Sequence, residues 1–210
     1  MQRFARSITV ILFVLGTIIQ GYSQKSFRLG VEYAPSSSKY TGSLLSTERL
    51  LVHSFNLLLT HPLSQEFDLE IGFGYRTVGD KHVSNGRDKV ITKYESKWIT
   101  MPIGIRYKVK KFFLTPRIYY SRNISHTLTQ QVFMDGEKIF DKTTQQTSNN
   151  QVTYKEDLFG VQLQLGYQFD LHGHYFHTGI YYDRSITAIN EDTPLSLKYN
   201  TIGIFFSAYL

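Results

Sequence analysis

Hydrophobic and polar residues alternate without a break between Phe159 and Phe169. Every second position in this stretch is apolar, and the positions between are glycine or glutamine. A strand sends successive side chains to opposite faces, so the pattern predicts a strand with one apolar and one polar face. The apolar face would point inward in a soluble sandwich and outward, toward lipid, in a transmembrane barrel. The predicted lipid-facing residues are Phe159, Val161, Leu163, Leu165, Tyr167 and Phe169.

The same alternation recurs in seven other segments of about ten residues, the length that a tilted strand needs to cross a bilayer. These predicted strands are 26–34, 50–61, 66–78, 97–109, 111–124, 175–187 and 201–210. The connections alternate in length, with tight turns at 61–65, 109–111 and 170–174 and longer polar stretches at 35–49, 79–96, 125–154 and 188–196. Short turns on one rim and long loops on the other are typical of outer-membrane barrels.

The polar faces of these strands decide between a sandwich and a barrel. They carry more ionised groups than a water-soluble core could hold without a large desolvation cost. Closing eight strands on themselves also removes the sheet edges that lipid does not tolerate. We therefore predict an all-β, eight-stranded, antiparallel, up-and-down transmembrane β-barrel, monomeric and in contact with outer-membrane lipid.

The charged lumen side chains interleave acids and bases. Because an eight-stranded barrel is only just wide enough for side chains to fill it, we interpret them as a structural network that plugs the lumen. The alternative is a path for protons or ions. The predicted network comprises Arg28, Glu32, Asp68, Glu70, Arg76, Arg106, Arg117 and Asp183.

The first residues are typical of an export signal. Arg3 and Arg6 precede an apolar run at 8–19 that is too short for a comfortable membrane span. Small residues follow, and we predict that residues 1–23 are a signal peptide, cleaved before Gln24, with the barrel domain at 24–210. An uncleaved anchor is the alternative. Export to the outer membrane would leave both ends of the mature chain in the periplasm.

Composition narrows the function. The chain has no cysteine, which excludes a disulfide scaffold, thiol catalysis and cysteine–zinc sites. Its formal charge is +6, is scattered along the chain and falls by two when the signal is removed, so we predict no nucleic-acid partner. Aromatic residues make up 15% of the chain, which suits interfacial girdles.

Two polar clusters contain residue types that occur in metal or catalytic sites. His172, His174 and His177 lie about the predicted turn at 170–174, and a metal site would need a further ligand, for which Asp170 is the nearby candidate. We interpret them as a polar turn, and we predict no metal and no cofactor.

The second cluster is a hydrolase arrangement. Ser125 and His126 lie near the outer end of one predicted strand, and Asp183 and Ser185 near the outer end of another, so a serine, a histidine and an acid could meet there. Short polar residues are equally expected where strands leave the membrane. We predict a protein that is not an enzyme, with a lipid-modifying barrel enzyme as the least favoured alternative.

Two of the long connections carry hairpin signals. Asp135-Gly136 is flanked by apolar alternation that includes Phe133, and Asn85-Gly86 lies within the other connection. Both strand pairs are predicted to continue above the membrane as a protruding ribbon, with two ordinary loops as the alternative. An exposed ribbon edge can recruit an extended partner by strand addition.

The middle of the chain carries a family resemblance. The segment 94–107 contains Trp98-Ile99-Thr100-Met101-Pro102-Ile103, which resembles the aromatic–aliphatic–x–x–Pro–aliphatic strand of the PorT-like outer-membrane β-barrel proteins of Bacteroidota. A short turn and an aromatic-rich strand at 111–120 follow, as in that family. Asp157 to Val161 with Gly166, and the pair Tyr181-Tyr182, are similar to later strands of the family. A proline inside a strand predicts a bulge or bend at Pro102.

The resemblance implies a barrel in a Gram-negative envelope and little about activity. One branch of the family is tied to type IX secretion. The chain departs from the pattern of bacterial barrels, which usually end in an aromatic residue, because its last residue is Leu210. The leading hypothesis is a non-enzymatic outer-membrane protein that acts through its extracellular loops in envelope assembly, adhesion or scaffolding, with an envelope or extracellular protein as partner. A narrow pore or transport accessory is the alternative.

Overall fold

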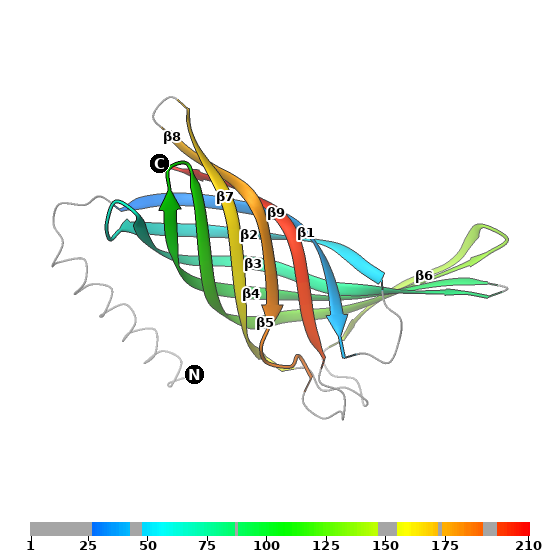
Figure 1. The fold of residues 1–210 in the computed structure, drawn as a ribbon. Helices are drawn as coiled ribbons and strands as arrows, with labels where there is room; N and C mark the ends of the chain where they lie inside the picture. The colour runs from blue at the N-terminus through cyan, green and yellow to red at the C-terminus, as the bar shows by residue number, and fades with distance from the viewer. Residues whose placement is uncertain (1–26, 43–47, 87, 147–154, 172–173, 191–196) are drawn as a thin grey trace.

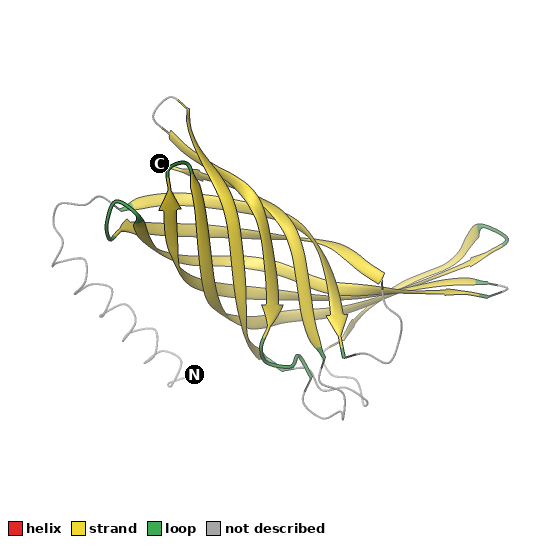
Figure 2. Ribbon diagram, in the orientation of Figure 1, coloured by secondary structure: helices red, strands yellow, loops and turns green. Residues whose placement is uncertain are grey.

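A computed structural model describes residues 27–42, 48–86, 88–146, 155–171, 174–190 and 197–210. The predicted signal peptide lies outside these residues. The described part of the chain consists of strands and short turns (Figure 2), and it includes no helix that is long and apolar enough to cross a membrane. Its strands are β1 Arg28–Thr41, β2 Glu48–Pro62, β3 Phe67–Asn85, β4 Lys89–Val109, β5 Phe112–Met134, β6 Glu137–Gln146, β7 Asp157–Leu171, β8 His174–Ser185 and β9 Lys198–Tyr209.

Eight of these strands form a closed ring. The sheet order is β4-β3-β2-β1-β9-β8-β7-β5-β6, and an additional pairing of β4 with β5 closes the circle. Every pairing is antiparallel, and sequence neighbours lie side by side around the ring. The predicted eight-stranded antiparallel barrel is therefore confirmed, and β6 is a ninth strand that pairs with β5 outside the ring.

Three strands are much longer than the barrel requires. Strands β3, β4 and β5 have 19, 21 and 23 residues, whereas the other ring strands have 12 to 15. Their excess length projects from one end of the barrel together with β6 (Figure 1). We call this projecting sheet the extension: residues 81–85 of β3, 89–96 of β4, 126–134 of β5 and all of β6. The short turns and the C-terminus lie at the opposite end, which we call the turn end.

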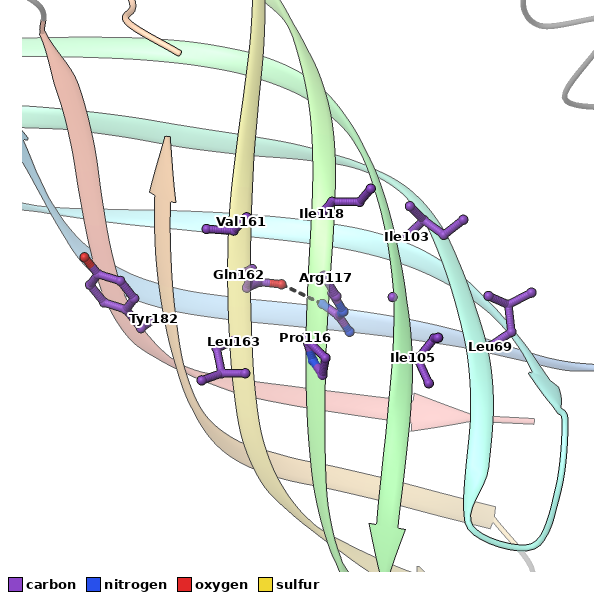
Figure 3. A pocket seen from close by; sticks show the side chains of 11 residues that line it. Leu69, Ile103, Ile105, Pro116, Arg117, Ile118, Val161, Gln162, Leu163 and Tyr182 are labelled. Carbon is purple, nitrogen blue, oxygen red and sulfur yellow. Dashed lines mark hydrogen bonds between the residues drawn. The ribbon is translucent and has the colours of Figure 1, made fainter. Parts of the chain in front are cut away.

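The outer surface of the ring is apolar. On β7, Phe159, Val161, Leu163, Leu165 and Phe169 are exposed, with Phe159 at 52%, and Tyr167 is half-exposed. Aliphatic and aromatic side chains of the neighbouring strands continue this belt (Figure 3). A shallow groove of about 540 Å3 crosses the belt beside Pro116. An apolar belt of this kind suits a barrel in a bilayer, because its side chains contact lipid tails instead of water.

The interior is not purely polar. Two clusters of buried apolar and aromatic side chains lie inside the ring alongside the charged groups. The larger comprises Tyr40, Val78, Trp98, Tyr119, Leu158, Ile189 and Tyr199, and the smaller comprises Ala34, Phe113, Tyr181 and Phe205. The alternation assigns polar residues to the lumen but does not predict these apolar fillers, because an inward and an outward apolar residue look alike in the sequence.

Two prolines alter the ladders without breaking them. Strand β1 continues to Thr41, beyond its predicted end at residue 34, and only its pairing with β9 is interrupted at Pro35. At Pro102 the β3–β4 pairing is likewise interrupted, but the register on both sides is the same. No bulge therefore forms at Pro102, and the predicted bend stays a prediction. The irregularity lies nearer the extension, where Lys97 and Trp98 face Ser125 and Asn123, so that Ile124 is the extra residue.

Candidate functional site

Two glutamates and two arginines meet at the centre of the lumen. Arg117 donates two parallel hydrogen bonds to Glu32, Nη1 to Oε1 and Nη2 to Oε2, each 3.0 Å long. Glu70 forms ion pairs with both Arg117 and Arg106. We call these four residues the central quartet; its formal charges cancel. Polar side chains of β2, β7 and β9 also hydrogen-bond to the quartet: Asn56, Gln162, Gln164, Ser207 and Tyr209.

A second ion pair lies nearer the extension. Arg76 Nη1 is 2.7 Å from Asp183 Oδ2, and the guanidinium stacks 4.1 Å from the centre of the Tyr119 ring. Tyr119 donates to Asp183 at 2.6 Å, and Arg76 donates to the hydroxyl of Tyr199 at 2.7 Å. Tyr119 and Tyr199, which contact this pair, belong to the larger apolar cluster. A void of about 10 Å3 beside the pair has room for one water.

The remaining predicted network residues lie near the turn end. Asp68 is buried and lies between two cations, 2.7 Å from Lys108 Nζ and 3.7 Å from Arg28 Nη2. Both cations are partly exposed, at 18% and 22% of their side chains. The structure thus divides the eight predicted lumen residues among three groups: the central quartet, the Arg76–Asp183 pair and the Arg28–Asp68 contact. Sequence reasoning did not predict which acid pairs with which base, because the partners lie on strands far apart in the chain.

This arrangement stabilises a filled lumen. A buried charge is tolerated when it is paired and hydrogen-bonded, and removal of one partner costs about 3–5 kcal/mol. The groups that bridge the lumen come from seven of the eight ring strands, so the network ties opposite walls together. Chemically it serves as a scaffold, because each carboxylate of the quartet is paired with at least one guanidinium.

The extension begins as a tight hairpin at its tip. Met134 pairs with Glu137 across Asp135 and Gly136, whose φ angles are 50° and 87°. Two central residues with positive φ define a type I′ turn, which matches the twist of the flanking strands. The Asp-Gly hairpin therefore forms as predicted. The Asn85-Gly86 signal differs in detail, because Asn85 is the last residue of β3 and pairs with Lys89.

The two predicted ribbons are joined into one sheet. Strand β4 pairs with β5 from Lys89↔Phe133 through Lys97↔Ser125, so the order in the extension is β3-β4-β5-β6. Both strand pairs thus continue beyond the barrel, and they do so as one four-stranded sheet that keeps the barrel register. A sheet of three or more strands is independently more stable than an isolated hairpin.

The two faces of the extension differ. The face that continues the lumen carries a row of apolar side chains, in which Val90, Val132 and Phe140 lie opposite one another and Tyr94 lies opposite Leu128. The other face is mixed: Thr129 and Thr143 hydrogen-bond at 3.1 Å and Gln131 donates to Asp141, while Val83 and Ile91 lie opposite each other. Exposed apolar residues gather at the tip: Met134, Ile139 and Phe140.

Strand β6 forms an edge of this sheet. Among the described residues it pairs with β5 alone, so the main-chain groups of its far side face away from the sheet. Lys138 Nζ lies 2.7 Å from Asp141 Oδ2, and both side chains are exposed. The hydrogen bonds from Lys138 and Gln131 hold the pKa of Asp141 below its ordinary value. The predicted ribbon residues Phe133, Asp135 and Gly136 lie beside or at the start of this edge.

The predicted serine–histidine arrangement does not form around Ser125. His126 instead points to the lumen side, where Ser96 Oγ lies 2.6 Å from its Nδ1 and Tyr40 bonds to the same hydroxyl. Asp183 is engaged by Arg76 and Tyr119, as described above, and Ser185 accepts from the main chain of β9. Burial lowers the pKa of His126 to about 4, so this imidazole is neutral at pH 7. The Ser96–His126 contact could not be read from the sequence, because it depends on the β4–β5 register.

The predicted histidine turn is only partly described. His172 lies outside the described residues, His174 is exposed, and His177 is buried against Phe113 and Tyr209 with a 3.2 Å contact to Gln168. Among the described residues, no group of three metal-ligating side chains is placed to hold an ion.

Comparison with known proteins finds similar solved structures but no family. No family model matches the chain, and no curated protein matches it. Solved structures with a similar fold include the attachment invasion locus protein Ail of Yersinia pestis, with 14% identity over 87% of this chain and 96% of that one at a TM-score of 0.40. Neisserial surface protein A has 11% identity over 87% and 97% at 0.41. The outer-membrane protease OmpT of Escherichia coli has 10% identity over 89% and 95% at 0.43. At these values the likenesses carry no argument about activity.

The class of protein follows from the chain's own structure. A closed eight-stranded antiparallel ring with an apolar belt outside and paired charges inside is an outer-membrane-type β-barrel.

Proposed function

We propose that this chain is a surface-exposed binding protein of the bacterial outer membrane that acts through its extension and not through its lumen. The observation that carries the proposal is the edge strand β6, held above the barrel by the continuous register of β3, β4 and β5. Natural proteins usually cover or interrupt such edges, because an edge recruits other strands. An edge of ten residues that is held away from the membrane is suited to strand addition.

We propose the orientation in the membrane from the two different ends of the barrel. The proposal places the turn end and the chain termini in the periplasm, after cleavage of residues 1–23, and the extension outside the cell. The lumen residues Arg28, Glu32, Asp68, Glu70, Arg76, Arg106, Arg117 and Asp183 then serve stability. The outward residues of β7 contact lipid, and the barrel is a monomer within its own membrane.

Removal of residues 129–146 tests the proposal, because it deletes the outer part of β5 and all of β6. Wild type and deletion variant would be displayed in the outer membrane of a host without adhesins, with heat-modifiable gel mobility as the check that both barrels fold. Cells carrying the wild type are expected to bind to coated surfaces or to one another, and the deletion variant to behave as the empty host. Equal binding by both variants would contradict the proposal.

Conductance in a planar bilayer separates this proposal from a narrow pore. A lumen filled by the central quartet and the aromatic cluster is expected to pass no current. Stepwise conductance by the wild type would favour the pore or transport alternative. Hydrolysis of lipid by the wild type that is lost on Ser96→Ala or His126→Ala would favour an enzyme instead.

We also propose that the chain is PorT-like. The support is that the segment resembling the family is strand β4, with Pro102 facing inward, and that the short turn at 110–111 and the aromatic strand β5 follow it. A link to type IX secretion would be tested by deleting the gene in its own host. Unchanged export of secretion cargo would exclude that branch.

A further inference from the structure

The residues of β6 have a charge pattern that complements itself. The strand begins Glu137-Lys138-Ile139-Phe140-Asp141-Lys142, so two apolar residues are flanked by charges. When two copies of such a strand run antiparallel with Ile139 opposite Phe140, Lys138 lies opposite Asp141 and Glu137 lies opposite Lys142. Each charged residue then faces a residue of opposite charge. The two-fold axis between the copies makes each of these pairs occur twice.

Facing side chains must also lie on the same side of the sheet, and the irregularity in β6 arranges this. Lys138 and Asp141 pair with Phe133 and Gln131 of β5, which are two residues apart and therefore on one face. In a regular strand, residues 138 and 141 would lie on opposite faces. The register shift between Val132 and Phe133 adds one residue, Ile139, to β6 and brings them together.

The second charged pair obeys the same rule. Glu137 and Lys142 pair with Met134 and Gln130 of β5, four residues apart and therefore on the other face. A symmetric antiparallel pairing thus has matched faces and matched charges on both sides of the sheet. Ile139 and Phe140, exposed at 56% and 43%, would meet their counterparts at its centre.

The direction of the strands decides where the second copy lies. Strand β6 runs from the tip of the extension toward the barrel. In an antiparallel pair the second β6 runs the opposite way, so the second barrel lies beyond the tip of the first. Two barrels at opposite ends of a joined ribbon belong to two different membranes.

We propose that the extension joins this chain to a second copy of itself on a facing membrane, by antiparallel pairing of β6 with β6 over residues 137–142. The inference rests on the proposed function and names its partner. Six residues a strand make a weak contact, and many copies in two facing membranes supply the avidity. The main-chain hydrogen bonds give affinity, and the charges give the register.

Charge variants of β6 in lipid vesicles test the inference. The full chain would be reconstituted into phosphatidylcholine vesicles, whose neutral surface adds no net charge, and clustering would be followed by dynamic light scattering. Wild-type vesicles are expected to cluster, and added salt to slow the clustering. Lys138→Glu sets two acids opposite each other, and Asp141→Lys sets two bases opposite each other. Each variant alone is expected to cluster about tenfold more slowly, because like charges directly opposite destabilise a strand pair.

The decisive sample mixes the two variants. When Lys138→Glu vesicles meet Asp141→Lys vesicles, residue 138 of each copy faces an opposite charge at residue 141 of the other, and clustering is expected to return. The double variant carrying both changes is expected to cluster by itself. Lys111→Glu, which makes the same charge change at the turn end, is the matched control and should cluster as the wild type does.

Other outcomes overturn the inference in distinguishable ways. Clustering that is equal in all variants, or a mixture that clusters no better than either variant alone, would contradict β6–β6 pairing. Wild-type vesicles that remain apart, while displayed cells still bind other surfaces in a manner that needs residues 129–146, would overturn self-pairing and leave the proposed function standing. Binding that does not need those residues would overturn both.

Discussion

The barrel and the extension share three strands, β3, β4 and β5, whose surroundings differ between the two regions. In the ring, β3, β4 and β5 have lipid on one side and paired charges on the other, and every strand has two neighbours. In the extension the same strands continue in register, but the sheet ends at β6 and its lumen-side face is no longer enclosed. In the closed ring every strand edge is paired, which stabilises the scaffold. In the open extension β6 leaves a strand edge to which another strand can be added.

A buried arginine of the lumen is expected to contribute more to barrel stability than an exposed arginine on the same strand. Arg117→Met would leave Glu32 and Glu70 short of a partner in the lumen, at a cost of about 3–5 kcal/mol. Arg122→Met makes the same change on the same strand, where the arginine is exposed and pairs with Glu156, at a cost below about 1 kcal/mol. Urea unfolding in lipid vesicles measures both. Equal shifts would show that the lumen network does not hold the barrel.

Glycine substitutions compare the stability of the barrel and of the extension with smaller expected effects. A Cβ added at Gly160 would collide with the hydroxyl end of Tyr119, which bonds to Asp183. Gly160→Ala is therefore expected to cost about 1–3 kcal/mol of barrel stability through overpacking. Gly136 has a φ of 87° and open space around it.

Gly136→Ala is the matched change in the extension. It is expected to strain the hairpin by about 1 kcal/mol and to leave unfolding of the barrel unchanged. Both variants would be followed by urea unfolding and by proteolysis of the hairpin. A barrel destabilised as much by the change at residue 136 would mean that the two regions unfold as one unit.

Acidification is expected to act at the boundary between the two regions. Folded His126 has a pKa of about 4, whereas an unfolded histidine has a pKa of about 6.5. Between these values only the opened form binds a proton, so the base of the extension loses stability as the pH falls from about 6.5 to about 4. Above pH 6.5 this contribution is constant.

Trp98, the only tryptophan in the chain, reports on this change, because its ring lies edge-on to His126 at 5.9 Å. Its emission is expected to be flat from pH 8 to pH 6.5 and to change below that. His126→Gln should remove the change. A transition centred near pH 6.5 in the folded protein would instead mean that His126 is accessible to water.

The sequence predicted the ring because alternation is a local property of each strand. Residues Phe159 to Phe169 alone indicate a two-faced strand, and eight such segments close a barrel. Pairings between strands could not be predicted in this way. Nothing near Arg106 in the chain shows that it meets Glu70, and nothing near Ser96 shows that it meets His126.

In the extension, too, the local turn was predicted and the pairing between strands was not. The Asp-Gly turn is a local signal and was predicted, since both residues adopt positive φ readily. The joining of the two ribbons depends on the β4–β5 register, which is set inside the barrel. Phe113, Phe205 and Leu158 fill the lumen for a similar reason: alternation separates apolar from polar residues but does not show which apolar residues face inward.

Hydrogen exchange of the chain in lipid vesicles, at a low copy number that prevents contact between vesicles, tests the division between scaffold and edge most directly. Amides of β5 from residue 112 to 122 have partners on both sides in the ring and are expected to exchange slowly. About half of the amides of β6 point away from β5 and are expected to exchange much faster. Equal protection of the two segments would contradict the account, because it would mean that β6 is covered and is not a free edge.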